Sequence, residues 1–286
     1  MSKSKLGIIA GSGDLPETLA KHAQKEGRSV FIVGIAGFVE PELLEQFAHK
    51  VISVGEVGKQ LSALKSENVN EVCFAGIVKR PNFKNLKLDA KGMMILPKVL
   101  KAASQGDDAL LRVLVKTIER EGFKVVGADD VLTSLVAPIG SLGKHSPSSA
   151  DFADIKKAAQ IAAEIGRLDI GQGAIVCDGL VLAVEAQEGT DLMLQRCAAL
   201  PDNLRGSTKV PRGVLVKRPK PVQERRVDLP TIGIRTLEGA KRACLSGIAY
   251  EANSALLLNM DELIAYADNN GLWIYGFEDT NLETER

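Results

Sequence analysis

The first half of the chain alternates short β-branched, apolar runs with amphipathic segments, and few folds can accommodate this alternation. Short apolar runs bounded by turn residues are typical of buried parallel strands, and apolar residues at a period near 3.6 indicate helices that pack on them. We therefore predict a doubly wound parallel sheet in the N-terminal half. The predicted strands are Leu6–Ala10, Val30–Val33, Val51–Val54, Val72–Ala75 and Lys124–Gly127.

Helical patterns lie between most of these strands. Pro16–Lys25, Glu40–Ala48 and Val57–Lys65 have helical spacing, and Met93–Arg120 is expected to hold two helices broken near Gln105-Gly106. Aromatic residues make up only 4% of the chain, so the cores must be built from Ala, Val, Leu and Ile. That composition suits helices packed on parallel sheets.

The length of 286 residues predicts about two domains. The composition shifts to Pro, Gly and Ser between Ala137 and Ser149, without apolar periodicity, and this shift predicts a domain boundary. We expect a Rossmann-like domain over residues 1–137, a linker over 138–149 and a smaller mixed α/β domain over 150–280.

Turn and cap signals outline the second domain. Ser148 or Ser149 can N-cap a helix that reaches about Ile165. Asp178-Gly179 between two apolar runs predicts a β-hairpin. The further predicted elements are a helix at Thr190–Leu200, a strand at Gly213–Val216 and a helix at Leu237–Leu245.

The charge balance excludes one function class. Lys and Arg number 36 and Asp and Glu number 36, so the net charge is zero and a nucleic-acid binder held by bulk positive charge is disfavoured. The four cysteines form no C-x-x-C pair and have mostly apolar neighbours, so they are expected to be reduced and buried. The sequence shows neither a signal core nor an apolar run long enough to span a membrane, and a cytoplasmic location is expected.

Several standard chemistries lack their motifs. With only His22, His49 and His145, the sequence contains no H-E-x-x-H, no Cys/His zinc spacing and no G-x-S-x-G elbow. Gly143-Lys144 is followed by histidine rather than Ser or Thr, so there is no P-loop. Zinc hydrolysis and Ser-His triads therefore lose most of their support.

The turn Gly11-Ser12-Gly13-Asp14 follows the first predicted strand and precedes a helix with Pro16 at its start. Backbone N–H groups and a helix N-terminus in this arrangement can receive a phosphate. The third glycine of the dinucleotide fingerprint is replaced by Pro16, and no acidic residue ends the second strand, so NAD binding is disfavoured. A tight turn without a ligand remains an equal alternative.

Three carboxylates follow one another at i+3 steps: Glu185, Glu188 and Asp191. Oxygen ligands of this kind suit Mg²⁺, which is usually shared with substrate phosphates. Acidic residues at a helix N-terminus also simply complement the helix dipole, and that alternative stays open.

A basic stretch precedes an isolated aspartate. Five cations between Lys217 and Arg226 lie close in sequence to Asp228, which is followed by a Pro-Thr-Ile-Gly turn. Phosphates require cations, and activation of a water requires a carboxylate. The alternative is a basic surface loop that ends in an Asx turn.

Four motifs in order carry a family resemblance: G-I-I-A-G-S-G-D-L-P at 7–16, G-D-D-A-L-L-R at 106–112, E-A-x-E-G-T-D at 185–191 and R-V-D-L-P-T-I-G at 226–233. Together they resemble the LpxI family, UDP-2,3-diacylglucosamine pyrophosphatases, over nearly the whole chain. The resemblance implies a Mg²⁺-dependent hydrolase of lipid A biosynthesis. Such an enzyme splits the diphosphate of its substrate into UMP and 2,3-diacylglucosamine 1-phosphate, with water attacking the α-phosphorus.

The resemblance also implies two domains with the substrate between them, and ligands of doubly wound sheets bind at the carboxyl ends of the strands. Asp228 is expected to be the essential residue, as a metal ligand or as the group that orients the water, with Glu188 and Asp191 as further metal ligands. The expected substrate-binding residues are Gly11, Ser12, Gly13, Asp14, Leu15, Gly76, Gly106, Asp107, Asp108, Gln187, Gly189, Thr190, Lys217, Arg226 and Thr231.

Competing functions remain at this point. One is an NAD-type oxidoreductase or nucleotide-sugar transferase that uses the Gly11–Gly13 turn, and another is a non-catalytic nucleotide-sugar or lipid-binding protein. The apolar cluster Met93–Leu96 with Val99 and Leu100 predicts either a groove for acyl chains or ordinary helix core. The expected partners are a lipid-linked UDP-sugar, the inner membrane surface through peripheral contact, and a second copy in a homodimer. The sequence leaves the oligomeric state open.

Overall fold

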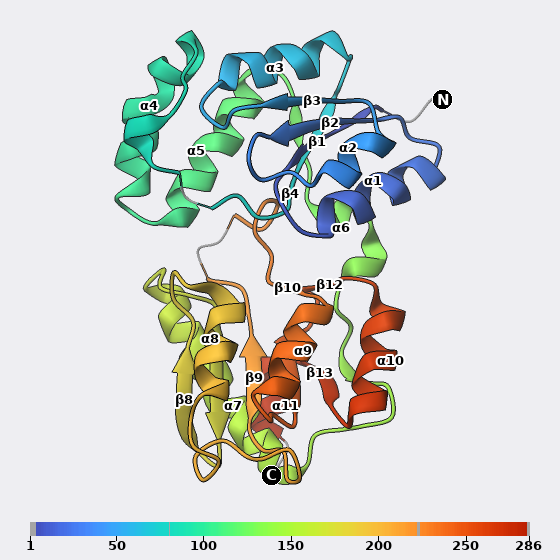
Figure 1. Ribbon diagram of the computed structural model, residues 1–286, viewed down its shortest axis with the longest axis vertical. Helices are drawn as coiled ribbons and strands as arrows, with labels where there is room; N and C mark the ends of the chain where they lie inside the picture. Colours follow the sequence, from blue (N-terminus) through green and yellow to red (C-terminus); the bar gives the residue numbers. More distant parts are fainter. Residues whose placement is uncertain (1–3, 80, 222–223, 285–286) are drawn as a thin grey trace. The chain divides into compact units, whose positions relative to one another are not determined.

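A computed structural model describes residues 4–79, 81–221 and 224–284, and the chain divides into two compact units (Figure 1). Unit 1 comprises Met1–Thr133 and Glu224–Asp228, and unit 2 comprises Ser134–Gln223 and Leu229–Arg286. The sequence placed the boundary within residues 138–149 and Asp228 in the second domain. The structure instead divides the chain after Thr133 and groups Asp228 with unit 1.

Unit 1 is built on a five-stranded sheet with the strand order β3-β2-β1-β4-β5, and every neighbouring pair is parallel. The central strand β1 pairs through Leu6 with Val30 on one side and with Glu71 on the other. All five residues of β1 are buried, as expected for a strand covered on both faces. The strands are β1 (Leu6–Ala10), β2 (Val30–Ile35), β3 (His49–Ile52), β4 (Glu71–Ala75) and β5 (Lys124–Val125).

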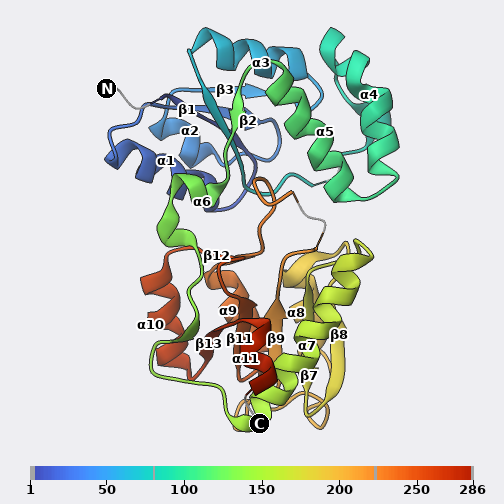
Figure 2. The same ribbon diagram turned by 180° about the vertical axis from the view of Figure 1, so that it is seen from behind.

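Helices cover both faces of this sheet (Figures 1 and 2). On one face, α3 and α5 bury Leu61, Leu64 and Val115 against Ile9 and Val33. The alternating strand residues point to the other face, which α1 and α6 cover. The helices are α1 (Leu15–Lys25), α2 (Pro41–Gln46), α3 (Val57–Ser66), α4 (Ala90–Ala103), α5 (Asp107–Arg120) and α6 (Ala128–Val131), with 3-10 turns at Phe83–Asn85 and Thr133–Leu135.

Most predicted elements of unit 1 are confirmed. The predicted helix break at Gln105-Gly106 falls in the gap between α4 and α5. The strand predicted at Val51–Val54 instead begins at His49, because parallel pairing with β2 draws two polar residues into the edge of the sheet.

Unit 2 has a six-stranded mixed sheet with the order β6-β13-β11-β9-β7-β8. The central strands β9, β11 and β13 are parallel, and β6, β7 and β8 add antiparallel edges. A separate parallel pair joins β10 to β12. The strands are β6 (Gly140–Leu142), β7 (Gly173–Cys177), β8 (Leu180–Val184), β9 (Val214–Lys217), β10 (Thr231–Ile232), β11 (Gly247–Glu251), β12 (Leu256–Leu257) and β13 (Trp273–Phe277).

Two apolar clusters lie on the two faces of the six-stranded sheet. Ile155 and Ala158 of α7 pack with Val216 and Ala249 on one face. The other face packs against α8, α9 and α10 around Leu215. The helices of unit 2 are α7 (Ser149–Arg167), α8 (Gly189–Ala198), α9 (Ile234–Arg242), α10 (Met260–Asn270) and α11 (Asp279–Thr284).

Some predictions for unit 2 are confirmed and others need correction. The hairpin is present, with positive φ at both Asp178 and Gly179, and Ser148 caps α7 with Asp151. The stretch expected as a linker contributes β6, whose Leu142 pairs with Ile274. Because the glycines and serines of this stretch show no alternation of apolar and polar residues, the sequence did not predict this edge strand. Unit 2 was expected to be the smaller domain but is the larger of the two units. The prediction left out β11, β13 and α10, which belong to it. Within the described residues, no helix has the length and apolar composition needed to cross a membrane.

Candidate active site

The turn after β1 is joined to the segment after β4 by backbone hydrogen bonds. The Gly11 N–H donates to the Ala75 carbonyl at 2.8 Å, and Ser12 exchanges two hydrogen bonds with Ile77 at 3.0 and 2.8 Å. A Cβ atom on Gly11 would lie 2.5 Å from the Ile77 carbonyl oxygen, and one on Gly76 would lie 2.6 Å from that of Ser12. The structure therefore brings Gly11, Ser12 and Gly76 together, and the close backbone approach requires glycine at two of these positions.

The remaining residues of this turn lead into α1. The Gly13 N–H faces the Glu40 carboxylate, with 3.4 Å from N to Oε1. Asp14 is the N-cap residue, but its side chain makes no capping hydrogen bond, and Leu15 is half-buried at the start of the helix. Two of the N–H donors expected to receive a phosphate are thus bonded to the backbone, and a third lies next to a negative charge. The phosphate role of this turn stays a prediction.

The start of α5 holds the second predicted motif of unit 1. Gly106 is the N-cap residue with φ of +127°, a conformation that favours glycine, and Asp107 and Asp108 form the first turn. The Asp108 side chain is buried. Its Oδ1 accepts a hydrogen bond from the Glu224 backbone N–H at 2.6 Å, and its Oδ2 pairs with Arg112 Nη2 at 2.8 Å.

This hydrogen bond anchors a turn at Glu224–Asp228. The Glu224 carbonyl accepts from the Val227 and Asp228 N–H groups at 3.0 and 3.3 Å. Val227 packs against the apolar cluster shared by the sheet, α3 and α5. Asp228 is half-buried at the end of the turn. The predicted catalytic residue is therefore fixed on unit 1 by the predicted motif at Gly106–Asp108.

Arg226 is ion-paired within the same turn. Its Nε and Nη2 bind the two Glu224 carboxylate oxygens at 2.9 and 3.0 Å, and its Nη1 binds Glu119 Oε1 at 2.7 Å. The Arg226 guanidinium lowers the pKa of Glu224, and the two carboxylates raise the pKa of Arg226. Sequence reasoning missed Glu224 and Glu119, because partners at i−2 and far along the chain follow no helix or strand period.

In unit 2, the three carboxylates between β8 and α8 point to three different partners. Glu188 Oε1 pairs with Arg196 Nη2 at 2.8 Å, and Asp191 Oδ2 pairs with Arg235 Nη2 at 3.1 Å. A backbone hydrogen bond from its own N–H, followed by the bond from Arg196, lowers the pKa of Glu188. Gly189 begins α8 with φ of +78°, and Gln187 before it is exposed.

Glu185, the first of the three carboxylates, is buried. Its Oε1 accepts a hydrogen bond from Thr190 Oγ1 at 2.8 Å, while its buried Oε2 has no hydrogen-bond partner among the described residues. Within the part of the chain that the structure describes, no three His, Cys, Asp or Glu side chains are grouped so that they could hold a metal ion. Glu188 and Asp191 belong to unit 2 and Asp228 belongs to unit 1, and the metal-binding role of these residues stays a prediction.

Lys217 ends β9, at the carboxyl end of the parallel strands of unit 2. Its side chain is 5% exposed, and its Nζ donates to the Thr231 carbonyl oxygen at 3.1 Å. Its strand neighbour Gly173 lies under the Glu185 carboxylate, since a Cβ on Gly173 would meet Glu185 Oε2 at 2.8 Å. Paired residues project to the same face, so the buried lysine and the buried carboxylate share one face of the sheet. This end of the unit is therefore the polar, carboxyl-end location where α/β sheets bind ligands.

The cations predicted as one cluster are divided between separate partners. Arg218 pairs with Glu251 at 2.6 Å, and Lys220 pairs with Asp169 at 2.6 Å. Arg226 lies in the other unit. Lys217 differs from Arg218, Lys220 and Arg226, because it forms no ion pair with a carboxylate among the described residues.

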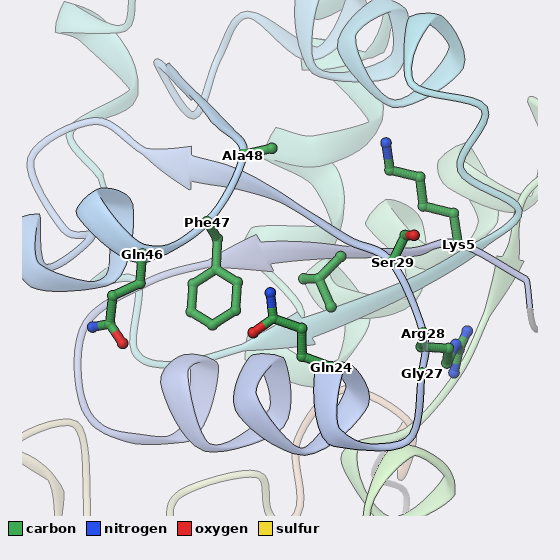
Figure 3. A pocket seen from close by; sticks show the side chains of 9 residues that line it. Lys5, Gln24, Gly27, Arg28, Ser29, Gln46, Phe47 and Ala48 are labelled. Carbon is green, nitrogen blue, oxygen red and sulfur yellow. The ribbon is translucent and has the colours of Figure 1, made fainter.

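A cavity of about 400 Å³ lies at the opposite end of the unit 1 sheet, between the segments that precede β1, β2 and β3 (Figure 3). Its two cations are compensated, since Lys5 pairs with Glu67 at 2.7 Å and Arg28 pairs with Glu71. Ligands of parallel α/β sheets bind at the carboxyl ends of the strands. This cavity at the amino ends is therefore separate from the predicted site residues.

The fold and these residues define a two-unit α/β protein with polar groups at the carboxyl ends of its parallel strands, an arrangement typical of α/β enzymes. Residues 5–135 match the LpxI N-terminal domain, and residues 138–275 match the LpxI C-terminal domain. The chain belongs to the LpxI family.

A relative from Caulobacter vibrioides, named UDP-2,3-diacylglucosamine pyrophosphatase LpxI, is 50% identical over 274 residues, which are 96% of this chain and 98% of the relative. Among solved structures, the Bordetella bronchiseptica enzyme WbmG, in complex with NAD and UDP, is 20% identical over 42% of this chain and 36% of its own, with a TM-score of 0.29. UDP-glucose-4-epimerase from Stenotrophomonas maltophila is 14% identical over 43% and 36%, with a TM-score of 0.28.

Proposed function

We propose that this chain hydrolyses the diphosphate of UDP-2,3-diacylglucosamine to UMP and 2,3-diacylglucosamine 1-phosphate, a step of lipid A biosynthesis. The observation that carries the proposal is the 50% identity, over nearly the full length of both chains, to a relative that bears this name. The order β3-β2-β1-β4-β5 with helices on both faces supports a Rossmann-like assignment of unit 1. The four buried free cysteines support a cytoplasmic location.

The reaction breaks the anhydride bond between two phosphorus atoms. In the proposed mechanism, water attacks the α-phosphorus, its oxygen remains on UMP, and the sugar phosphate leaves. Asp228 orients this water or accepts its proton, because it is the half-buried carboxylate that the Asp108 anchor fixes in place. Lys217 is the cation proposed to bind a phosphate oxygen, because its buried ammonium has no carboxylate partner among the described residues.

Mg²⁺ dependence is part of the proposal, although the described residues form no three-carboxylate group. Mg²⁺ is commonly held through one or two carboxylates together with substrate phosphates, and such an ion would neutralise diphosphate charge. Glu188 and Asp191 are each ion-paired with an arginine, so an ion bound there would compete with Arg196 and Arg235.

The test is UMP release from UDP-2,3-diacylglucosamine by the full chain, with Mg²⁺ and with EDTA. We expect turnover that EDTA abolishes, and a fall in kcat on the order of a hundredfold or more for Asp228→Ala. Asp261→Ala, an exposed aspartate on α10, is the matched control and should keep wild-type activity. A cooperative thermal transition within a few degrees of wild type in both variants shows that the fold is intact.

Three results would contradict the proposal. Absence of turnover with tight, metal-independent binding would favour a non-catalytic nucleotide-sugar or lipid-binding protein. Co-purified NAD would favour an oxidoreductase. Near-normal kcat for Asp228→Ala would remove Asp228 from the mechanism while leaving the substrate assignment in place.

A further inference from the structure

Helix α4 of unit 1 is apolar on its exposed side as well as on its buried side. Gly92, Val99 and Ala102 face the protein, where α4 packs beside α5 and α3 (Figure 1). On the other side, Met93 is 59% exposed and Met94 is 63% exposed. The cluster predicted from the sequence as an acyl groove or helix core is therefore neither uniformly buried nor associated with the cavity described above.

The exposed residues of α4 form one continuous face. With 3.6 residues per turn, Met93, Pro97 and Leu100 fall in one stripe, and the neighbouring stripe adds Met94 and two lysines. Leu100 is 44% exposed. We call this surface the α4 face, made of Met93, Met94, Pro97, Lys98, Leu100 and Lys101.

The charge of the helix has a single sign. The sequence of α4 contains three lysines and no acidic residue. Lys91 precedes Met94 on the same stripe, and its charge is already compensated by an ion pair with Glu121. Lys98 and Lys101 are exposed among the apolar side chains. The surface complementary to the α4 face is therefore apolar and negatively charged.

A second exposed segment of unit 1 has the same composition. Ile77 is 64% exposed and Val78 is 38% exposed, and the exposed Lys79 follows them directly after β4. Apolar side chains mixed with lysines are typical of elements that lie in the interface of an anionic bilayer, where the chains insert and the lysines extend to the headgroups.

We propose that the α4 face docks unit 1 onto the surface of an anionic lipid bilayer. The inference builds on the proposed function, since a substrate with two acyl chains resides in a membrane. It goes beyond that function because it assigns the contact to a defined helix. Binding requires no turnover, so the docking surface and the reaction can fail independently.

The test is sedimentation of the full chain with vesicles of phosphatidylcholine alone or with added phosphatidylglycerol. We expect binding only with phosphatidylglycerol, and weaker binding as salt rises. Each lysine near an anionic surface contributes about fivefold to the partition coefficient, so Lys98→Glu/Lys101→Glu should lose at least about 25-fold. Met93→Ser/Met94→Ser should lose on the order of tenfold.

Matched controls are available for the apolar side chains and for the lysines. Leu180→Ser/Val181→Ser removes two apolar side chains of similar exposure from β8, and Lys25→Glu/Lys209→Glu reverses two exposed lysines elsewhere. Both control variants should bind like wild type. A thermal melt of each variant checks the fold. One α4 variant changes charge and the other changes apolar surface, so if one of them fails to fold, the other still tests the proposal.

The proposal is overturned if wild type does not bind the anionic vesicles, or if the α4 variants bind them as well as the controls do. It is also overturned if vesicle binding is unchanged while the KM for detergent-dispersed substrate rises in Met93→Ser/Met94→Ser. That result would assign the surface to the substrate's own acyl chains. UMP release in detergent reports on the proposed function separately.

Discussion

Replacing Asp108 with alanine tests whether this carboxylate holds the Asp228 turn on unit 1. The substitution removes the acceptor for the Glu224 N–H and the partner of Arg112. A hydrogen bond to a charged group contributes about 1.5–3 kcal/mol, a helical i,i+4 ion pair about 0.3–0.5 and an acidic residue in the first helical turn about 0.3–1. The expected loss for Asp108→Ala is therefore about 2–4 kcal/mol.

Asparagine at position 108 separates these contributions. Asp108→Asn keeps an oxygen acceptor for the Glu224 N–H but loses the charge, so the expected loss is about 1–2 kcal/mol. Asp261→Ala removes a first-turn carboxylate from α10 without any anchoring hydrogen bond and should cost about 0.3–1 kcal/mol. The expected order of destabilisation is Asp108→Ala, then Asp108→Asn, then Asp261→Ala.

Two measurements are needed because the turn can detach without global unfolding. Urea denaturation gives the free energy of unfolding, and hydrogen exchange of peptides that cover 224–228 reports local opening. We expect Asp108→Ala to increase exchange in this turn and to lower kcat. Wild-type exchange at 224–228 together with a stability loss below about 0.5 kcal/mol would show that Asp108 is not the anchor.

Three further predictions concern other parts of the chain. Gly76→Ala should destabilise unit 1 by about 2 kcal/mol or more in urea denaturation, because φ is +84° and the new Cβ would lie 2.6 Å from the Ser12 carbonyl oxygen; unchanged stability would contradict this. Burial raises the pKa of the Cys73 thiol to about 12, so its thiolate fraction at pH 8 is about one part in ten thousand. All four buried cysteines should then resist a disulfide reagent until the protein unfolds, and a rapidly reacting native thiol would refute this. Hydrolysis in ¹⁸O water should label UMP, whereas label in the sugar phosphate would place the attack on the β-phosphorus.

The sheet of unit 1 was predictable because its strands are continuous apolar runs. Leu6–Ala10 is buried at every residue. A strand buried on both faces has no exposed polar positions, so its sequence is an uninterrupted apolar run. The strands β11 and β13 were not predicted, although β13 is buried at every residue and β11 at all but its last. The run of β11, Gly-Ile-Ala-Tyr-Glu, contains Gly, Ala and Glu, which are depleted in strands, so its local propensity is weak. The run of β13, Trp-Ile-Tyr-Gly-Phe, is rich in strand-favouring aromatic residues, so its composition did indicate a strand that was not predicted.

The i+3 spacing of the three carboxylates, across the end of a strand and the start of a helix, suggested that they converge, but the structure gives them different partners. Glu185 precedes α8, which begins only at Gly189, so i+3 steps do not place Glu185, Glu188 and Asp191 on one face. Their partners include Arg235, 44 residues further on, which no local pattern indicates. The anchor of Glu224 on Asp108 spans 116 residues and is equally invisible to local pattern.

The return of Glu224–Asp228 to unit 1 means that the two units are not two consecutive halves of the chain. The polypeptide leaves unit 1 after Thr133, re-enters it for five residues and leaves again. A fragment that ends at Thr133 lacks Asp228, and a fragment that begins at Ser134 carries Asp228 without the residue that holds it. Given the proposed role of Asp228, neither fragment alone should hydrolyse the substrate, and an exchange of units at residue 133 should not transfer the activity.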